Sequence, residues 1–173
     1  MRVIQQKAPF LAWTLEAFST KIAVITGWRF EGMQLLIVTN CSARKTATAV
    51  SALRARSLPR GTPSELAAAW RSRVDNADGR VRALQLYSGR NFSIAHEVAK
   101  YYGAELRVLS AGMGLIKPSA VVPPYDLTIS TGERDCILGR APRRQLFSAQ
   151  QWWQVIRARN PGISPFEIGI AHV

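Results

Sequence analysis

Residues 34–39 read QLLIVT, and this short run decides the expected fold class. It is a continuous apolar run with β-branched residues, as is typical of a strand that is buried on both faces in a parallel sheet. A polar loop, residues 40–45 (NCSARK), follows it directly. Open α/β sheets build their ligand sites in loops that follow strand ends. The stretch therefore predicts an α/β protein with its chemistry beside this strand.

Three further motifs between residues 35 and 130 also follow short apolar runs: 87–90 (YSGR), 110–115 (SAGMGL) and 124–126 (PYD). Residues 81–87 and 105–109 predict strands. The helix expected between them, at 92–102, would end at Gly103. Strand–helix–strand order is typical of a βαβ unit. We therefore expect a single α/β domain with a mostly parallel central sheet flanked by helices.

The two chain ends predict extra helical segments. Residues 1–34 would form an arm or a helix, since apolar residues at 8–19 have helical spacing, and residues 21–28 read as a strand. Residues 131–173 would form a basic loop and a C-terminal helix at 148–160. Capping-box patterns stand at the start of that helix and of another at 62–74. The prolines at 123 and 124 exclude residues 121–130 from a central strand.

The charge is strongly basic: 23 basic residues face 11 acidic ones in 173 residues, a net charge of +12. Eighteen of the basic residues are Arg, which favours contact with phosphates and base edges. An Arg-rich composition also follows from a high-GC genome, so charge alone does not decide. We expect DNA as partner, without excluding a solvated basic surface.

Several classes of protein are not indicated. Residues 1–34 lack the continuous apolar segment of a signal peptide, and no apolar run spans 18 residues, so we expect a cytoplasmic protein without a membrane partner. Two cysteines and two histidines lack the spacing of a zinc site, and no dinucleotide or P-loop motif is present. We expect neither metal nor cofactor, and the oligomeric state stays open.

Asp126 is the candidate catalytic residue. Two prolines precede the Tyr125–Asp126 pair and would hold the carboxylate in place. A lone carboxylate that faces a sugar can stabilise an oxocarbenium-like centre or activate water, as N-glycosidic cleavage requires. The alternative is an aspartate that caps a turn or pairs with an arginine.

The other candidate residues fall into two groups. The substrate- or base-binding candidates are Cys41, Ser42, Tyr87, Ser88, Gly89, Ser110, Met113 and Tyr125. The phosphate- or DNA-binding candidates are Arg44, Lys45, Arg90, Arg140, Arg143 and Arg144. Cys41 reads as a packing residue rather than a nucleophile, because no histidine lies near it in sequence to activate it. Each motif also has a structural reading, as a turn with packed side chains.

At these motifs the chain resembles the YaaA-like superfamily, over roughly residues 35–130. The matching elements are a Cys-Ser-x-x-Lys-type loop at 41–45, a Tyr-Ser-Gly motif at 87–89, a Leu-Ser-Ala-x-x-Gly-Leu turn at 109–115 and Pro-Tyr-Asp at 124–126. Relatives often carry a polar pair where this chain has Gly112 and Met113. The resemblance implies an α/β fold and a link to DNA binding or damage protection.

Taken together, the sequence predicts a DNA glycosylase-like enzyme that cleaves or exchanges the N-glycosidic bond of a modified base. The base would have to leave the stack to reach a pocket at the strand ends. One alternative is a non-catalytic, protective DNA-binding protein, which would lack any activity for Asp126→Asn to remove. Another is a deoxyribosyltransferase-like enzyme, which would act on free nucleotides without salt-sensitive DNA binding.

Overall fold

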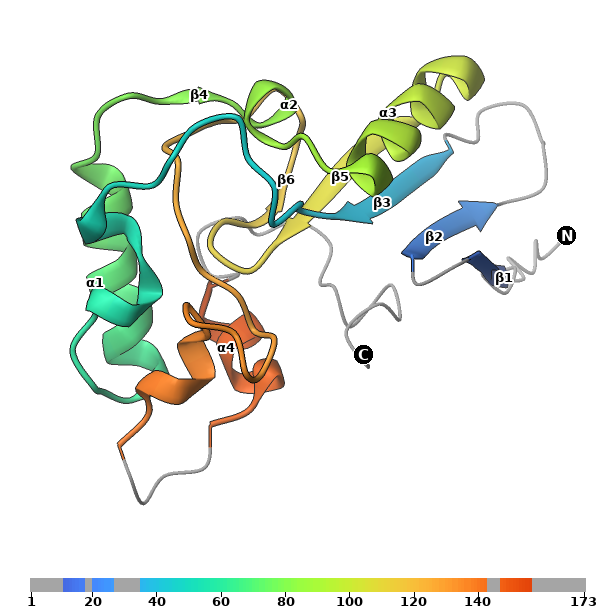
Figure 1. Ribbon diagram of the computed structural model, residues 1–173. Helices are drawn as coiled ribbons and strands as arrows, with labels where there is room; N and C mark the ends of the chain where they lie inside the picture. Colours follow the sequence, from blue (N-terminus) through green and yellow to red (C-terminus); the bar gives the residue numbers. More distant parts are fainter. Residues whose placement is uncertain (1–10, 18–19, 27–34, 143–146, 157–173) are drawn as a thin grey trace, which may run out of the picture.

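A five-stranded mixed sheet forms the centre of this α/β fold (Figure 1). The computed structural model describes residues 11–17, 20–26, 35–142 and 147–156. The strand order is β1-β2-β3-β5-β6. The strands are β1 (Leu11–Ala17), β2 (Thr20–Thr26), β3 (Leu36–Asn40), β5 (Glu105–Ser110) and β6 (Gly114–Ile116). Among the described strands only β3 and β5 pair in parallel, so the expected mostly parallel sheet is not confirmed.

The strand expected at 21–28 is confirmed by β2, whereas the described part of the segment expected to be an arm or a helix at 8–19 is the strand β1. β1 and β2 form an antiparallel pair, and β2 continues the sheet onto β3. The sequence of β1, LAWTLEA, also alternates larger apolar residues with small or polar ones, which is the strand period. When a short run fits both the helical and the strand period, its conformation depends on whether another strand pairs with it.

Helix α3 (Arg90–Tyr102) covers β3 and β5, where its buried residues Ala95 and Ala99 pack with Ile37 and Leu106 (Figure 1). Gly103 ends it in the left-handed conformation, at φ 61°, as the sequence predicts. Helices α1 (Pro63–Asp75) and α4 (Ala149–Ile156) pack against each other and enclose the main core. Both capping boxes are confirmed by hydrogen bonds.

The strand expected at 81–87 is wrong for most of its length. The only strand within it is β4 (Val81–Arg82), which pairs with β7 (Val121–Val122) in a separate two-stranded sheet. The next residues form the short helix α2 (Ala83–Leu86). The Ala83 amide donates to the Ala120 carbonyl at 2.8 Å, which removes this segment from the main sheet. The βαβ unit is therefore not built on residues 81–87; the parallel strands are β3 and β5.

The basic segment that follows β3 is ordered. It contains the 3-10 turns η1 (Ser51–Leu53) and η2 (Ala55–Ser57), and a third turn, η3 (Ile137–Arg140), lies further along the chain.

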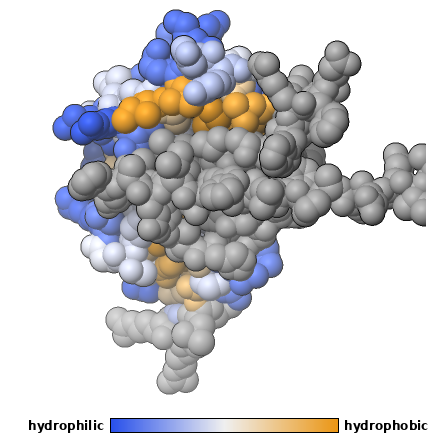
Figure 2. Space-filling view, turned by 90° about the vertical axis from the view of Figure 1, so that its right-hand side faces the viewer, coloured by the Kyte–Doolittle hydropathy of each residue, from blue (hydrophilic) through white to orange (hydrophobic). Residues whose placement is uncertain are grey.

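Figure 2 shows hydrophilic residues over much of the described surface on one face, with an apolar strip across it.

Candidate functional site

The carboxyl ends of β3 and β5 lie at the same edge of the sheet, because these two strands run in parallel. The loop after β3 begins there, and the Cys41 amide donates to the Leu109 carbonyl at 2.8 Å. The expectation that polar loops gather at strand ends is therefore confirmed for two of the four motifs, 40–45 and 110–115.

The 87–90 motif joins the same edge through the loop after β3. The Ser88 amide donates to the Arg44 carbonyl at 3.1 Å, and Lys45 and Tyr87 form an antiparallel bridge. A Cβ placed on Gly89 would lie 2.2 Å from the Ser42 Oγ, so only glycine lets the two loops approach this closely. Gly89 thus acts as a packing contact between the two loops.

Three buried hydroxyl groups connect the remaining motifs. The Tyr87 and Tyr125 hydroxyls lie 2.7 Å apart, and the Tyr125 hydroxyl also bonds the Ser110 Oγ. The Met113 amide donates to the same Ser110 Oγ at 3.1 Å. Burial, and then the nearby Cys41, raise the pKa of both tyrosines above the ordinary value. The tyrosines are therefore neutral hydrogen-bonding groups that hold three loops together.

The rings of these tyrosines are packed in the core. Tyr87 is 3% exposed and meets Phe92 edge-on, with ring centroids 5.6 Å apart; Tyr125 is fully buried and meets Trp70 in the same way at 6.0 Å. Neither ring offers an open face for stacking. Any contribution they make to a site comes from their hydroxyls and from the residues that they position.

Asp126 lies between two cations. Its Oδ1 is 3.9 Å from the Lys45 Nζ and its Oδ2 is 3.6 Å from the Arg54 Nε. Its backbone is held on both sides, since its amide donates to Leu53 and its carbonyl accepts from Ala55, each at 2.8 Å. The carboxylate is 39% exposed, so it is fixed in position and still reachable from solvent.

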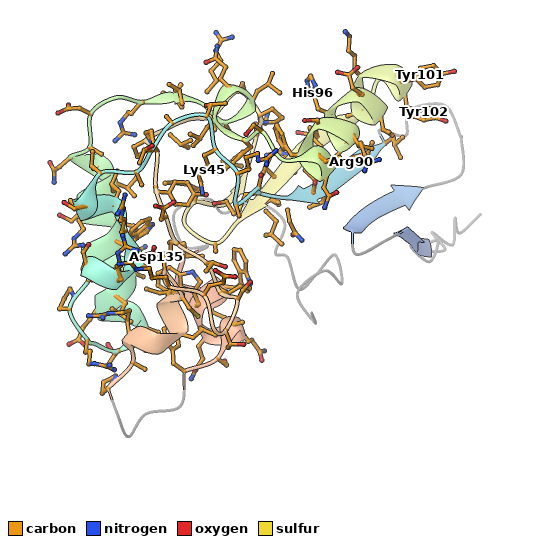
Figure 3. The ribbon with its side chains drawn as sticks, viewed as in Figure 1. Lys45, Arg90, His96, Tyr101, Tyr102 and Asp135 are labelled. Carbon is orange, nitrogen blue, oxygen red and sulfur yellow. The ribbon has the colours of Figure 1, made fainter. Side chains whose placement is uncertain are left out.

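The Lys45 side chain is nearly buried, with 9% of its surface exposed. Its Nζ lies 4.9 Å from the centroid of the Tyr125 ring, a cation–π contact. Figure 3 places Lys45 in the interior of the molecule, whereas Tyr101 and Tyr102 project from the far end of α3. This ammonium and the Asp126 carboxylate form a charge pair beside the buried hydroxyls.

A pocket of about 530 Å³ opens at this edge of the sheet. Cys41, Ser42 and Lys45 line it, as the sequence analysis expected of a strand-end site. Its other walls come from the ends of β3 and β5, the segment after Asp126 and helix α4: Asn40, Ala43, Leu109, Ala111, Leu127, Thr128, Ile129, Ser130, Thr131, Ala149 and Trp153. We call this cavity the strand-end pocket.

Sequence reasoning missed the hydroxyl-rich wall of the strand-end pocket, formed by Thr128, Ser130 and Thr131. The signal was a run of small polar residues directly after Pro-Tyr-Asp. Helix α4 carries two adjacent tryptophans, Trp152 and Trp153. In the structure both are buried: Trp152 donates its indole N–H to the Ala111 carbonyl at 2.7 Å, and Trp153 lines the pocket.

Several expected site residues lie elsewhere. Met113 lines a different cavity, of about 200 Å³, together with Trp70 and Ile116. The Arg140 guanidinium donates to the Leu58 carbonyl, so it supports the fold at this position. Arg44 and Arg90 are exposed, and Figure 3 shows Arg90 at the start of α3. Arg143 and Arg144 lie outside the described residues.

The described part of the chain contains no group of three or more His, Cys, Asp or Glu side chains that could hold a metal ion. None of its helices is long and apolar enough to cross a membrane.

A family model described as a family of unknown function (DUF6884) matches residues 72–151. The matched segment includes Tyr87, Ser110 and Asp126 but begins after the Cys41–Lys45 loop. No curated protein and no solved structure matches the chain.

Proposed function

We propose that this protein is a DNA glycosylase-like enzyme that cleaves or exchanges the N-glycosidic bond of a modified base. The observation that carries the proposal is the Lys45–Asp126 pair beside the strand-end pocket. Asp126 is held beside Lys45, which lines the pocket, and a fixed carboxylate is the group that N-glycosidic cleavage needs, since positive charge develops at C1′ of the sugar as the base departs.

The strand-end pocket suits a nucleobase in size and lining. Its volume of about 530 Å³ is within the usual range for small-molecule sites. The hydroxyls of Ser42, Ser130 and Thr131 can bond base edges, and Trp153 supplies an aromatic wall. A base that leaves the duplex stack would enter here. Cys41 would contribute packing.

The charge supports a polyanion rather than a free nucleotide as substrate. The net charge is +12, and Arg44 and Arg90 are exposed beside the loops that border the site. Ser88 and the Gly89 backbone, at the start of α3, are further candidates for a phosphate. Such an enzyme would work in the cytoplasm, where DNA is present. The resemblance to the YaaA-like superfamily stays a prediction, since the matching family model carries no function.

The test is base release from duplex DNAs that each carry one modified base, compared with plain duplex. Alkali breaks the strand wherever a base has been lost. Asp126→Asn should lower the rate of strand breakage by about 10²–10⁴-fold while DNA affinity is retained. Asp135→Asn is the matched control, because Asp135 also pairs with an arginine, at 3.1 Å from Arg56, whereas Asp126 pairs with Lys45, which lines the strand-end pocket.

Breaks on one modified substrate that vanish in Asp126→Asn would establish the activity and identify the base. Tight, salt-dependent binding without breaks on any substrate would contradict the proposal and leave the non-catalytic DNA-binding protein. Release of base from free nucleotides alone would indicate the deoxyribosyltransferase-like enzyme.

A further inference from the structure

The Lys45 amine has the surroundings of a nucleophile. Its side chain is nine-tenths buried, and its Nζ makes one ion pair, with Asp126 at 3.9 Å, and one cation–π contact, with the face of the Tyr125 ring at 4.9 Å. No hydrogen bond to a protein carbonyl or hydroxyl engages the nitrogen in the described part of the chain. The nitrogen therefore lies at the wall of the pocket with a carboxylate beside it that can act as a base when the amine reacts.

Backbone contacts at Lys45 and at the next residue hold Lys45 in position. The bridge to Tyr87 fixes its backbone, and the Thr46 amide donates to the Leu86 carbonyl at 2.9 Å. The Tyr125 hydroxyl is already bonded to Tyr87 and Ser110, so only its ring face is left for the lysine. The side chain is therefore directed by packing at the strand-end pocket, which it lines.

We propose that Lys45 forms a covalent Schiff base with C1′ of the deoxyribose, so that the enzyme is also a lyase for abasic sites. The proposal rests on the proposed function for its substrate class, DNA. Lysine amines form Schiff bases with carbonyl substrates, and the ring-opened form of an abasic sugar is an aldehyde.

The lyase reaction at an abasic site begins at the Lys45 amine. Asp126 accepts a proton from the Lys45 ammonium, and the neutral amine adds to the C1′ aldehyde. The carbinolamine loses water to give an iminium ion. Loss of the C2′ proton then expels the 3′-phosphate, which leaves with the C3′–O electron pair and breaks the strand. Water hydrolyses the iminium, which returns the amine to Lys45.

On a site that still carries its base, the Lys45 amine attacks C1′ directly. The base leaves with the electrons of the C1′–N bond and takes up a proton. The sugar ring then opens, as the nitrogen lone pair forms the iminium and the ring oxygen accepts a proton. The sequence consumes no oxidant or reductant.

The experiment is borohydride trapping on duplex DNA that contains one preformed abasic site, so that base recognition is not needed. Borohydride reduces the iminium to a stable amine and leaves the protein joined to the DNA. In the wild-type protein we expect the adduct on the peptide that contains Lys45, located by mass spectrometry. The chain has five lysines, which keeps the assignment simple.

Lys45→Arg keeps a cation beside Asp126 but cannot form the iminium, and it should lose the adduct. Lys100→Arg, on the exposed side of α3, is the matched control and should retain it. Cys41 lines the same pocket, but its adduct with C1′ would be a hemithioacetal, which borohydride does not convert into a stable link. Mapping in the wild type gives the answer even if a variant fails to fold.

The outcomes separate this inference from the proposed function. An adduct at Lys45 without base release from any substrate would support the lyase step and contradict the glycosylase. Base release with no adduct, or with an adduct at another amine, would overturn the role of Lys45 and leave the glycosylase with water as nucleophile. Neither base release nor an adduct would contradict both.

Discussion

At the scale of single residues, the chain is tightly packed around Tyr125. Gly112 lies against this ring: a Cβ on it would be 2.5 Å from the Tyr125 Cε2. The Gly112 carbonyl accepts from the Trp70 indole N–H at 2.7 Å. Position 112 therefore needs a residue without a side chain for a steric reason. The same contact packs the ring on which Lys45 rests.

Gly112→Ala should destabilise the protein by about 1–3 kcal/mol, because the added methyl group cannot fit without moving Tyr125. Urea unfolding followed by tryptophan fluorescence measures the change. Gly139→Ala is the control, since a Cβ there has nothing within 4 Å. Equal stability of the two variants would mean that the ring is free to move.

The buried tyrosines should make the protein sensitive to alkaline pH. Burial raises the pKa of Tyr87 and Tyr125 above the ordinary 10.0. The folded state therefore keeps protons that the unfolded chain releases. The free energy of unfolding is at its full value below pH 10 and falls as the pH rises above about 10.

Tyr87→Phe removes one of the two titrating groups, so it should reduce the alkaline loss of stability while also removing a buried hydrogen bond, at a cost of about 1–3 kcal/mol at neutral pH. Urea unfolding at neutral pH and above pH 10 measures both effects. Tyr102→Phe is the matched control, because Tyr102 is 65% exposed. If the free energy of unfolding of Tyr87→Phe fell above pH 10 as steeply as that of the wild type, the buried Tyr87 hydroxyl would not be a cause of the alkaline loss of stability.

At the scale of elements, the helices with complete caps are those that the sequence predicts best. In α1 the Thr62 Oγ1 accepts from the Glu65 amide at 3.3 Å, and the Glu65 carboxylate accepts from the Thr62 amide at 2.8 Å. These bonds join residues three apart, so the pattern can be recognised without the tertiary structure. The hydrogen bonds from Thr62 lower the pKa of Glu65.

Thr62→Ala should lower the free energy of unfolding by about 1 kcal/mol, because it leaves an N-terminal amide of α1 without its acceptor. Thermal or urea unfolding measures this. Ser64→Ala, at an exposed position of the same turn, should change stability little. A cap effect as small as that of Ser64→Ala would show that α1 is held by packing alone.

Strands were harder to predict than helices, since their pairing partners are distant in sequence. Residues 81–87 are rich in apolar residues, yet only Val81 and Arg82 form a strand, because the following amides bond the turn at 117–120. Residues 11–17 fit both periods, and pairing with β2 makes them a strand. β6 and β7 were not expected at all.

At the scale of the whole molecule, the excess of positive charge predicts DNA binding that depends strongly on salt. Each phosphate contact releases counterions, and the logarithm of the binding constant falls linearly with the logarithm of the salt concentration. Arg44 and Arg90 are exposed near the strand-end pocket, while Arg82 lies on β4 in the separate sheet.

Arg44→Gln and Arg90→Gln should each reduce, by about one, the magnitude of the slope of the logarithm of the binding constant against the logarithm of the salt concentration. This is the change expected for one lost phosphate contact. Fluorescence anisotropy with labelled duplex at several salt concentrations measures it. Arg82→Gln should leave the slope unchanged. If all three variants had the same slope of the logarithm of the binding constant against the logarithm of the salt concentration as the wild type, the DNA would bind to another face.

The sequence by itself determined the features that depend on neighbouring residues: the capped helices α1 and α4, the glycine that ends α3, the buried strand β3, and the polar loop that follows it. It also placed Cys41, Ser42 and Lys45, which line the strand-end pocket, in a loop after a strand, because residue type and a strand end are visible locally. Only the tertiary structure decided that the sheet is mixed, that Tyr87 and Tyr125 are buried, and that Lys45 faces Asp126. Those facts depend on contacts between residues about 40 to 80 positions apart, and the free energy of such contacts comes from packing and burial, which no local pattern encodes.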